Sequence, residues 1–256
     1  MSTALRLTLL SGWGVDSRIW QSLAPHWPEG VNVTTPNWPG YSLSRDETST
    51  RADTTPALVE PASLTATADA MTDKLAPDSV WVGWSLGGLL ATALTAHLPA
   101  PQGLILLGAG AHFCTAGGVT PDALADFTRA FERSPTATWR HFLRWQTRGE
   151  PSPSAAFREL SSLLGSTPPA DTATLAAGLG WLSTLDNRER LAALPCPVTH
   201  LAGKNDPLLG AEPQAERLVT RLTQAGHCPM VSQPAALVEV LHRLAAGMTT
   251  RPVEAS

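Results

Sequence analysis

A serine stands between two glycines at the point where a predicted strand meets a predicted helix. The segment reads Gly83-Trp84-Ser85-Leu86-Gly87, a G-x-S-x-G pattern. The apolar run before it is typical of a buried strand, and the Ala/Leu-rich run at 86–97 predicts a helix. A chain that reverses direction here holds the serine in a strained conformation with its hydroxyl exposed. We therefore predict that Ser85 is a nucleophile; the alternative is a loop serine between two packing glycines.

A serine hydroxyl needs a base to take its proton and an acid to orient that base. In a strand–turn–helix setting the acid and then the histidine come later in the chain, each after a strand. Asp206 follows the predicted strand 198–202, and His227 follows the predicted strand 218–223. The order predicts a Ser85, Asp206, His227 triad. The alternatives are a turn aspartate and a polar loop histidine.

Other candidate groups fit the triad less well. His242 falls inside a predicted helix, His200 inside a predicted strand and His97 at a helix end. Cys228 lies beside His227, but no strand–turn–helix elbow presents it as a nucleophile.

A tetrahedral intermediate also needs donors for its oxyanion. One donor is the backbone N–H of the residue after the nucleophile, Leu86, at the start of a helix. The second normally comes from an early loop after a strand, and Ser11-Gly12-Trp13-Gly14 follows the predicted strand 4–10. We predict the N–H of Trp13 as that donor; the alternative is a simple tight turn.

Alternating strands and helices must position these loops. Alternation of this kind favours an α/β fold with right-handed crossovers and a mainly parallel sheet flanked by helices. Aspartate 16 is expected to cap a helix after the first strand, and Pro234 to open the last helix. The remaining strands are expected at 31–36, 80–82 and 103–108.

The segment 111–186 differs from the rest because it shows helical runs broken by prolines and no clear strand. We predict that it is a helical lid inserted into a core formed by 1–110 and 187–248. Residues 43–62 are expected to be a polar loop, and 249–256 a disordered tail.

One helix of this insertion, expected at 136–148, has two distinct faces. Helical spacing places Trp139, Phe142, Leu143 and Gln146 on one face. A glutamine on an apolar face predicts an inward polar contact, to an ester or a water. Another face carries arginines at i, i+4 and i+8 with few acids nearby, namely Arg140, Arg144 and Arg148. This face is either a solvated surface or a docking surface.

Composition excludes several classes of protein. The chain has 256 residues, 43% of them hydrophobic, with a net charge of -4, and no region is basic enough to bind nucleic acid by charge alone. The three cysteines form no disulfide or zinc pattern, which favours a reducing cytoplasm. We see no signal peptide. The uncharged run 79–121 is interrupted by glycines and prolines, so it predicts buried elements and not a membrane span.

These motifs together resemble the α/β-hydrolase family, and more narrowly the pimeloyl-[acyl-carrier protein] methyl ester esterases of biotin synthesis. The likeness covers nearly the whole chain. Its narrower signals are the Gly-Trp-Ser-Leu-Gly-Gly elbow and a Phe-Leu-x-x-Gln-Thr segment; the other matching segments are Gly12-Trp13-Gly14, Pro39 to Ser44, Arg140-His141 before that segment, and Asp186-Asn187-Arg188. The chain differs at Ser11, where the family usually has histidine.

The resemblance implies an α/β-hydrolase fold with a lid and a serine esterase that needs no metal or other cofactor. It implies Ser85, Asp206 and His227 as the triad, with Trp13 and Leu86 as oxyanion donors. It places the acyl chain along Phe142, Leu143, Arg144, Trp145 and Gln146. It further implies a substrate bound to acyl carrier protein, docked on a basic surface made of Arg140, Arg144, Arg148 and Arg158. We expect a monomer.

Other functions compete with this interpretation. A broad-specificity carboxylesterase or a carbon–carbon bond hydrolase would use the same triad, and a non-catalytic binding protein of the same fold would not use it. A haloalkane dehalogenase is excluded, because that chemistry needs a carboxylate at position 85.

Overall fold

The central element is a parallel β-sheet. The computed structural model describes residues 4–41, 63–115, 117–209 and 219–249. Within them the sheet has six strands in the order β2-β1-β3-β4-β5-β6, and all neighbouring strands run parallel, as predicted. The strands β3 and β4 are buried along their whole length, which explains their continuous apolar sequences. The strands span Arg6–Leu10 (β1), Asn32–Thr34 (β2), Val80–Trp84 (β3), Gly103–Leu107 (β4), Val198–Gly203 (β5) and Val219–Leu222 (β6).

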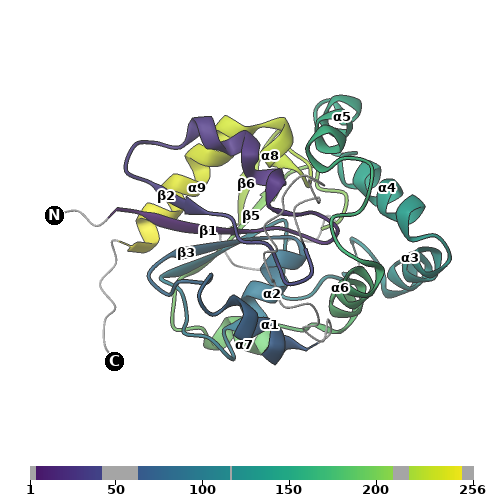
Figure 1. Cartoon of the computed structure of the whole chain (residues 1–256). Helices are drawn as coiled ribbons and strands as arrows, with labels where there is room; N and C mark the ends of the chain where they lie inside the picture. The colour runs from purple at the N-terminus through teal and green to yellow at the C-terminus, as the bar shows by residue number, and fades with distance from the viewer. Residues whose placement is uncertain (1–3, 42–62, 116, 210–218, 250–256) are drawn as a thin grey trace, which may run out of the picture.

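Helices cover both faces of this sheet (Figure 1). One face carries the 3-10 helix η1 (Ser17–His26) together with α8 (Pro229–Ser232) and α9 (Pro234–Thr249). The other face carries α1 (Leu64–Met71), α2 (Leu86–Leu94) and α7 (Arg188–Ala193). The apolar core therefore lies in two layers, one on each side of the strands.

Several sequence predictions need correction. The side chain of Asp16 caps the element after β1 as expected, but that element is a 3-10 helix with Pro25 inside it. The short helices α7 and α8 were not predicted, and α9 continues to Thr249, the first residue of the predicted tail. The predicted loop 43–62 and the rest of the tail, 250–256, lie outside the described residues.

The predicted insertion is helical, and it lies beyond the carboxyl ends of the strands (Figure 1). Its helices α3, α4 and α5 each begin at a proline, a residue that suits a first helical turn because its missing N–H would have no partner there. The backbone N–H of Asn187 donates to the carbonyl of Ala111 at 2.8 Å, so the two ends of the insertion meet. The division into core and lid remains a prediction. The helices are α3 (Pro121–Arg133), α4 (Pro135–Gln146), α5 (Pro153–Leu164) and α6 (Thr172–Thr184).

Candidate active site

Ser85 lies in a sharp turn between β3 and α2. Among the described residues it is the one non-glycine residue with positive φ, at 55°. Its N–H donates to the carbonyl of Leu107 at 2.9 Å, which ties the turn to β4. A Cβ on Gly83 would lie 2.4 Å from the Cα of Gly88, so strand and helix approach too closely there for any side chain. The predicted strained turn is therefore present.

Asp206 and His227 form a buried pair. Asp206 follows β5 and His227 follows β6, and His227 Nδ1 lies 2.7 Å from Asp206 Oδ2. The two side chains are 2% and 1% exposed, respectively. The other carboxylate oxygen, Asp206 Oδ1, accepts from the N–H of Leu208 at 2.9 Å. Because a carboxylate can only accept, Nδ1 carries the hydrogen and Nε2 of the neutral ring is left as an acceptor.

The residue before the serine connects the elbow to this pair. Trp84 Nε1 donates to the carbonyl oxygen of His227 at 2.8 Å, and the centres of the Trp84 and His227 rings are 5.3 Å apart. A Cβ on Gly108, at the end of β4, would meet the His227 ring at 3.1 Å and Asp206 Oδ2 at 3.3 Å. His227 Nε2 is buried and has no hydrogen-bond partner within the described part of the chain, so its bond to Ser85 is not formed here. Hydrogen bonds between base and nucleophile are often long without substrate and tighten in the complex.

The loop after β1 lies against the nucleophile. A Cβ on Gly12 would come 3.0 Å from the Cβ of Ser85. Trp13 is the next residue of this loop, and Leu86 is the first residue of α2, whose N–H has no acceptor within the helix. Ser11 stands where the family usually has histidine. It is buried, and its hydroxyl has no hydrogen-bond partner among the described residues.

The insertion holds this loop in place. Trp139 Nε1, on α4, donates to the carbonyl of Gly14 at 2.7 Å, and the N–H of Gly14 donates to Tyr41 Oη at 3.0 Å. Trp13 Nε1 donates to the carbonyl of Leu175, on α6, at 2.7 Å. Burial raises the pKa of Tyr41, so its phenol stays neutral. Helical spacing places Trp139 on the apolar face of the helix expected at 136–148, but it does not predict this bond.

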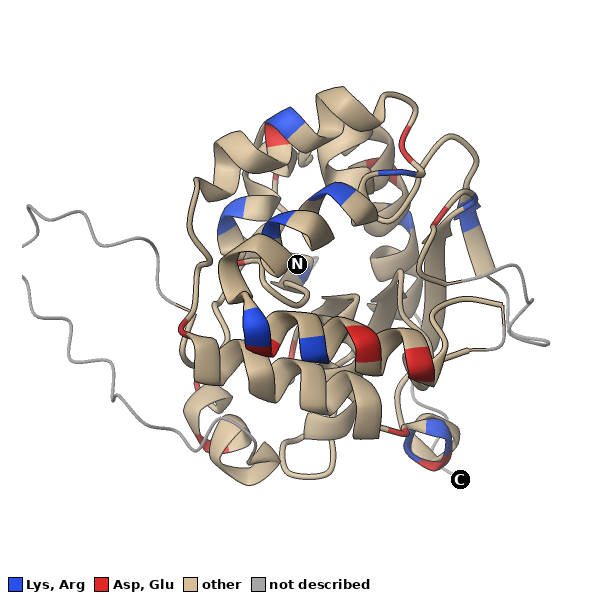
Figure 2. Cartoon of the chain, turned by 90° about the vertical axis from the view of Figure 1, so that its right-hand side faces the viewer, with Lys and Arg blue, Asp and Glu red and all other residues tan. Residues whose placement is uncertain are grey.

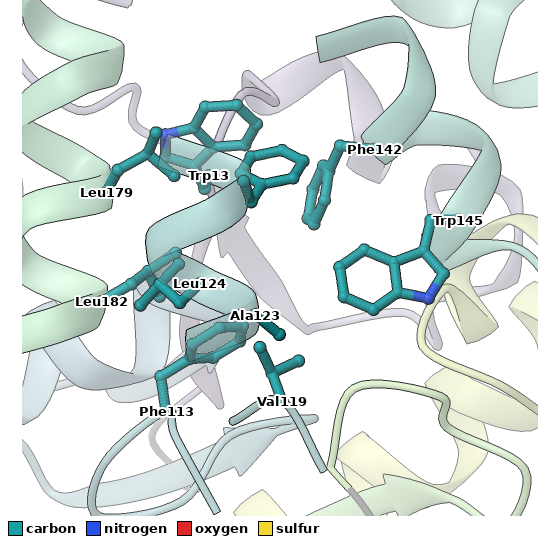
Figure 3. A pocket seen from close by; sticks show the side chains of 10 residues that line it. Trp13, Phe113, Val119, Ala123, Leu124, Phe142, Trp145, Leu179 and Leu182 are labelled. Atoms are coloured by element: carbon teal, nitrogen blue, oxygen red, sulfur yellow. The ribbon is translucent and has the colours of Figure 1, made fainter. Parts of the chain in front are cut away.

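An apolar cavity opens beside Trp13 (Figure 3). The indole of Trp13 packs edge-on against Phe142 with ring centres 5.1 Å apart, and Trp145 lies beyond Phe142 along α4. The cavity has a volume of about 20 Å³, room for about one water molecule. Its other walls come from α3, α6 and the segment before α3, with Leu124, Leu179 and Phe113 among their residues.

The predicted acyl-binding residues are not all in this cavity. Phe142 and Trp145 line it, whereas Leu143 and Gln146 are buried without lining it. Arg144 is exposed, with its guanidinium carbon 4.7 Å from the centre of the Phe157 ring. Gln146 points inward as expected, and neither atom of its carboxamide has a hydrogen-bond partner in the described chain. Its contact with an ester or a water remains a prediction.

Basic residues lie on the outer surface of the insertion (Figure 2). Arg140, Arg144 and Arg148 are all exposed on or just after α4, a helix without any acidic residue. Arg158 on α5 is exposed as well. On α3, by contrast, Arg129 forms an ion pair with Asp126. Among the described residues, three of the arginines on this surface that have no ion pair therefore lie on or just after α4.

The buried thiol of Cys228 is not suited to attack. Burial, and next the negative charges of Glu150 and Asp206, raise the pKa of Cys228 well above its usual value. A protonated buried thiol is a poor nucleophile.

Across residues 4–41, 63–115, 117–209 and 219–249, no three His, Cys, Asp or Glu side chains gather as a metal site requires. In the same ranges no helix has the length and apolar character to cross a bilayer.

Comparison with known proteins identifies the family. The profile described as "Alpha/beta hydrolase family" matches residues 9–240. The chain belongs to the alpha/beta hydrolase family. The fold agrees: an esterase from Exiguobacterium antarcticum superposes with a TM-score of 0.73 over 96% of this chain and 93% of that one, at 18% identity.

The curated relatives described next are similar to this chain over nearly their whole length, and both carry the same name. A pimeloyl-[acyl-carrier protein] methyl ester esterase from Klebsiella pneumoniae (strain 342) is 30% identical to this hydrolase, over 92% of its chain and 91% of the relative. One of the same name from Aromatoleum aromaticum is 32% identical, over 91% and 96%. The predicted fold, resemblance and class of carboxylic ester hydrolase are thereby confirmed. The roles of individual residues remain predictions.

Two glycines of α6 offer a matched test of how this helix supports the site. A Cβ on Gly178 would lie 2.6 Å from Trp13 Cδ1, whereas a Cβ on Gly180 would meet nothing within 4 Å. We expect Gly178→Ala to displace Trp13, to cost about 1–3 kcal/mol of stability and to lower ester turnover. Gly180→Ala should stabilise the hydrolase by about 0.5–1 kcal/mol through helix propensity. Urea unfolding and initial rates measure both; equal behaviour of the two variants would contradict the close packing of Trp13.

Proposed function

We propose that this hydrolase is a serine carboxylesterase that cleaves the methyl ester of pimeloyl-acyl carrier protein and releases methanol, a step of biotin synthesis. The observation that carries the proposal is the buried hydrogen bond of 2.7 Å between His227 and Asp206, together with a serine in a strained turn whose neighbour Trp84 donates to the carbonyl of His227. The names of the relatives described above support the choice of substrate.

In the proposed mechanism, His227 Nε2 takes the proton of Ser85 as its Oγ attacks the ester carbonyl. The backbone N–H groups of Trp13 and Leu86 hold the oxyanion. Methanol leaves with the proton from His227, and a water activated by His227 then hydrolyses the acyl-enzyme. Asp206 keeps the imidazole in the required tautomer and stabilises its cation. The proposal requires no metal or organic cofactor.

The substrate's own geometry suits the two faces of α4. The methyl ester lies at the end of the pimeloyl chain far from the carrier protein, so the chain must extend from Ser85 to the surface. Phe142 and Trp145 line the cavity beside Trp13, and we assign the acyl chain to this side. The unpaired carboxamide of Gln146 is costly in a buried position. The ester or a water would satisfy it.

The opposite side of α4 is assigned to the carrier protein. Acyl carrier proteins are acidic, and exposed arginines attract such a partner over a long range. Arg140, Arg144 and Arg148 supply this charge, and Arg158 extends it onto α5.

A second candidate is a broad-specificity carboxylesterase. The specific observation in its favour is the small size of the apolar cavity beside Trp13, which has room for little more than a water molecule. Side chains must move to admit a long acyl group, whereas a short one needs less rearrangement.

Methanol release distinguishes the two candidates. The substrates are pimeloyl-carrier-protein methyl ester, free dimethyl pimelate and a short p-nitrophenyl ester. We expect clear preference for the carrier-bound ester. Charge reversal to Glu at Arg140, Arg144 and Arg148 should raise KM for that ester about 10- to 100-fold, since rim charges govern encounter, and leave the free esters unchanged.

The matched control reverses the same number of charges on other elements, at Arg190, Arg221 and Arg243, which are exposed too. It should leave KM for the carrier-bound ester near that of the unmodified enzyme. Equal loss in both triple variants would point to net charge and not to docking on α4. Better turnover of short free esters would favour the second candidate.

A further inference from the structure

A buried carboxylate from the insertion holds the backbone on both sides of His227. Glu150 lies between α4 and α5 and is 4% exposed. Its Oε1 accepts from the N–H of Cys228 at 2.6 Å, and its Oε2 accepts from the N–H of Gly226 at 3.1 Å. The hydroxyl of Ser232, on α8, also donates to Oε2, at 2.5 Å. The residues immediately before and after the proposed base are thus both bound to one side chain.

The segment that carries Glu150 packs against the acid loop as well. A Cβ on Gly149 would lie 1.9 Å from the carbonyl oxygen of Asn205, the residue before Asp206. The N–H of Asn205 in turn donates to the carbonyl of Ala225 at 3.0 Å. A Cβ on Gly226 would meet the backbone of Gly149 at 2.7 Å. The three loops therefore touch backbone to backbone, and one of them belongs to the insertion.

The chemistry of the contact requires a carboxylate. No Lys or Arg in the described ranges forms an ion pair with Glu150, and a buried carboxylate without a cation is costly unless hydrogen bonds satisfy it. Three donors converge on its two oxygens, and only an acceptor-only group can accept from all of them. An amide would turn its NH₂ toward an N–H or a hydroxyl. Because burying the Glu150 carboxylate costs desolvation free energy, its presence indicates a role in the site that it contacts.

We propose that Glu150 is a positioning residue that fixes the His227 ring for proton transfer, so that the insertion forms part of the catalytic framework and not only a cover. This inference rests on the proposed role of His227 as the base. Glu150 does not line the apolar cavity. Its loss therefore changes the placement of the base and leaves the binding of a short ester intact.

The test compares Glu150→Gln with Glu159→Gln, the same chemical change at an exposed position of α5. We expect Glu150→Gln to lower kcat for the short p-nitrophenyl ester about 10²-fold, the scale expected for a misplaced catalytic group. KM should change less than about twofold, because uniform substrate binding is untouched. Glu159→Gln should match the unmodified enzyme in both. A folded Glu150→Gln enzyme with normal kcat overturns the proposal.

A second measurement does not depend on turnover. The hydrogen-bonded Nδ1 proton of His227 should give a far-downfield NMR signal, which its loss in His227→Gln would assign. We expect it to shift or broaden in Glu150→Gln and to stay unchanged in Glu159→Gln. An unchanged signal together with lower kcat would overturn the positioning role. If the ester is not a substrate at all, the proposed function fails, while this signal still decides whether Glu150 fixes the ring.

Ser232→Ala covers the case in which Glu150→Gln does not fold. It removes one of the three donors to Glu150 and leaves both backbone bonds in place. We expect the same changes in kcat and in the Nδ1 signal, at smaller size. If both stay as in the unmodified enzyme, Glu150 does not position the base.

Discussion

Ser85→Ala is expected to lower kcat for ester hydrolysis by about 10⁴- to 10⁶-fold, as loss of a triad nucleophile does elsewhere. The change removes the attacking oxygen without altering the pocket. KM for the short ester and the thermal unfolding temperature should therefore remain close to those of the unmodified enzyme. Alanine at a φ of 55° is strained, but the serine it replaces bears the same strain. Methanol release over long incubations measures the residual rate.

A fluorophosphonate probe supplies the matching chemical readout. It should label the unmodified enzyme at Ser85 and leave Ser85→Ala unlabelled. Ser183→Ala, a change at an exposed position of α6, serves as the control and should retain both rate and labelling. Substantial turnover by Ser85→Ala would show that another group attacks the ester, and the proposed mechanism would be wrong.

The elbow could be predicted because its causes are local. The buried strand, the glycines that flank the serine and the Ala/Leu-rich helix follow one another directly in the sequence. Gly83 is needed because the strand and the helix nearly touch there. The positions of Asp206 and His227 follow from the chain order of a parallel sheet, since each comes after a strand that ends at the same edge.

The support around the triad could not be predicted, because it depends on contacts between distant segments. Glu150 accepts from residues 76 and 78 positions away, and Trp139 donates across 125 positions. Helical spacing correctly placed Trp139 on a buried face, but such a pattern does not say what that face contacts. In the sequence, Glu150 is one of the two acids between Arg129 and Arg158, and nothing in its surroundings there indicates a partner.

Short elements were missed for a different reason. The helices α7 and α8 have six and four residues, too few to show a period of 3.6. In η1 the apolar residues Ile19, Trp20 and Leu23 are buried, but the spacing of apolar residues over a short element does not distinguish a 3-10 helix from an α-helix. The site is unaffected, since none of the three elements carries a predicted triad residue.

Asp206→Asn is expected to lower kcat about 10⁴-fold while the protein stays folded. Asp206 Oδ1 accepts from the N–H of Leu208, so an asparagine would keep its carbonyl oxygen there and direct its NH₂ at His227 Nδ1. The NH₂ group can only donate, which forces the ring hydrogen onto Nε2. Nε2 would then be unable to accept the proton of Ser85. Asp73→Asn, at an exposed position after α1, should leave kcat unchanged.

Combining Asp206→Asn with Glu150→Gln shows whether both act through the same imidazole. If Glu150 only positions His227, its removal should matter little once the ring has the wrong tautomer, so the two losses in kcat should be far from additive in free energy. Ser183→Ala in the Asp206→Asn background provides the neutral comparison. Full additivity of the two losses would mean that Glu150 acts independently of the His227 ring. Near-wild-type kcat in Asp206→Asn alone would instead remove Asp206 from the triad.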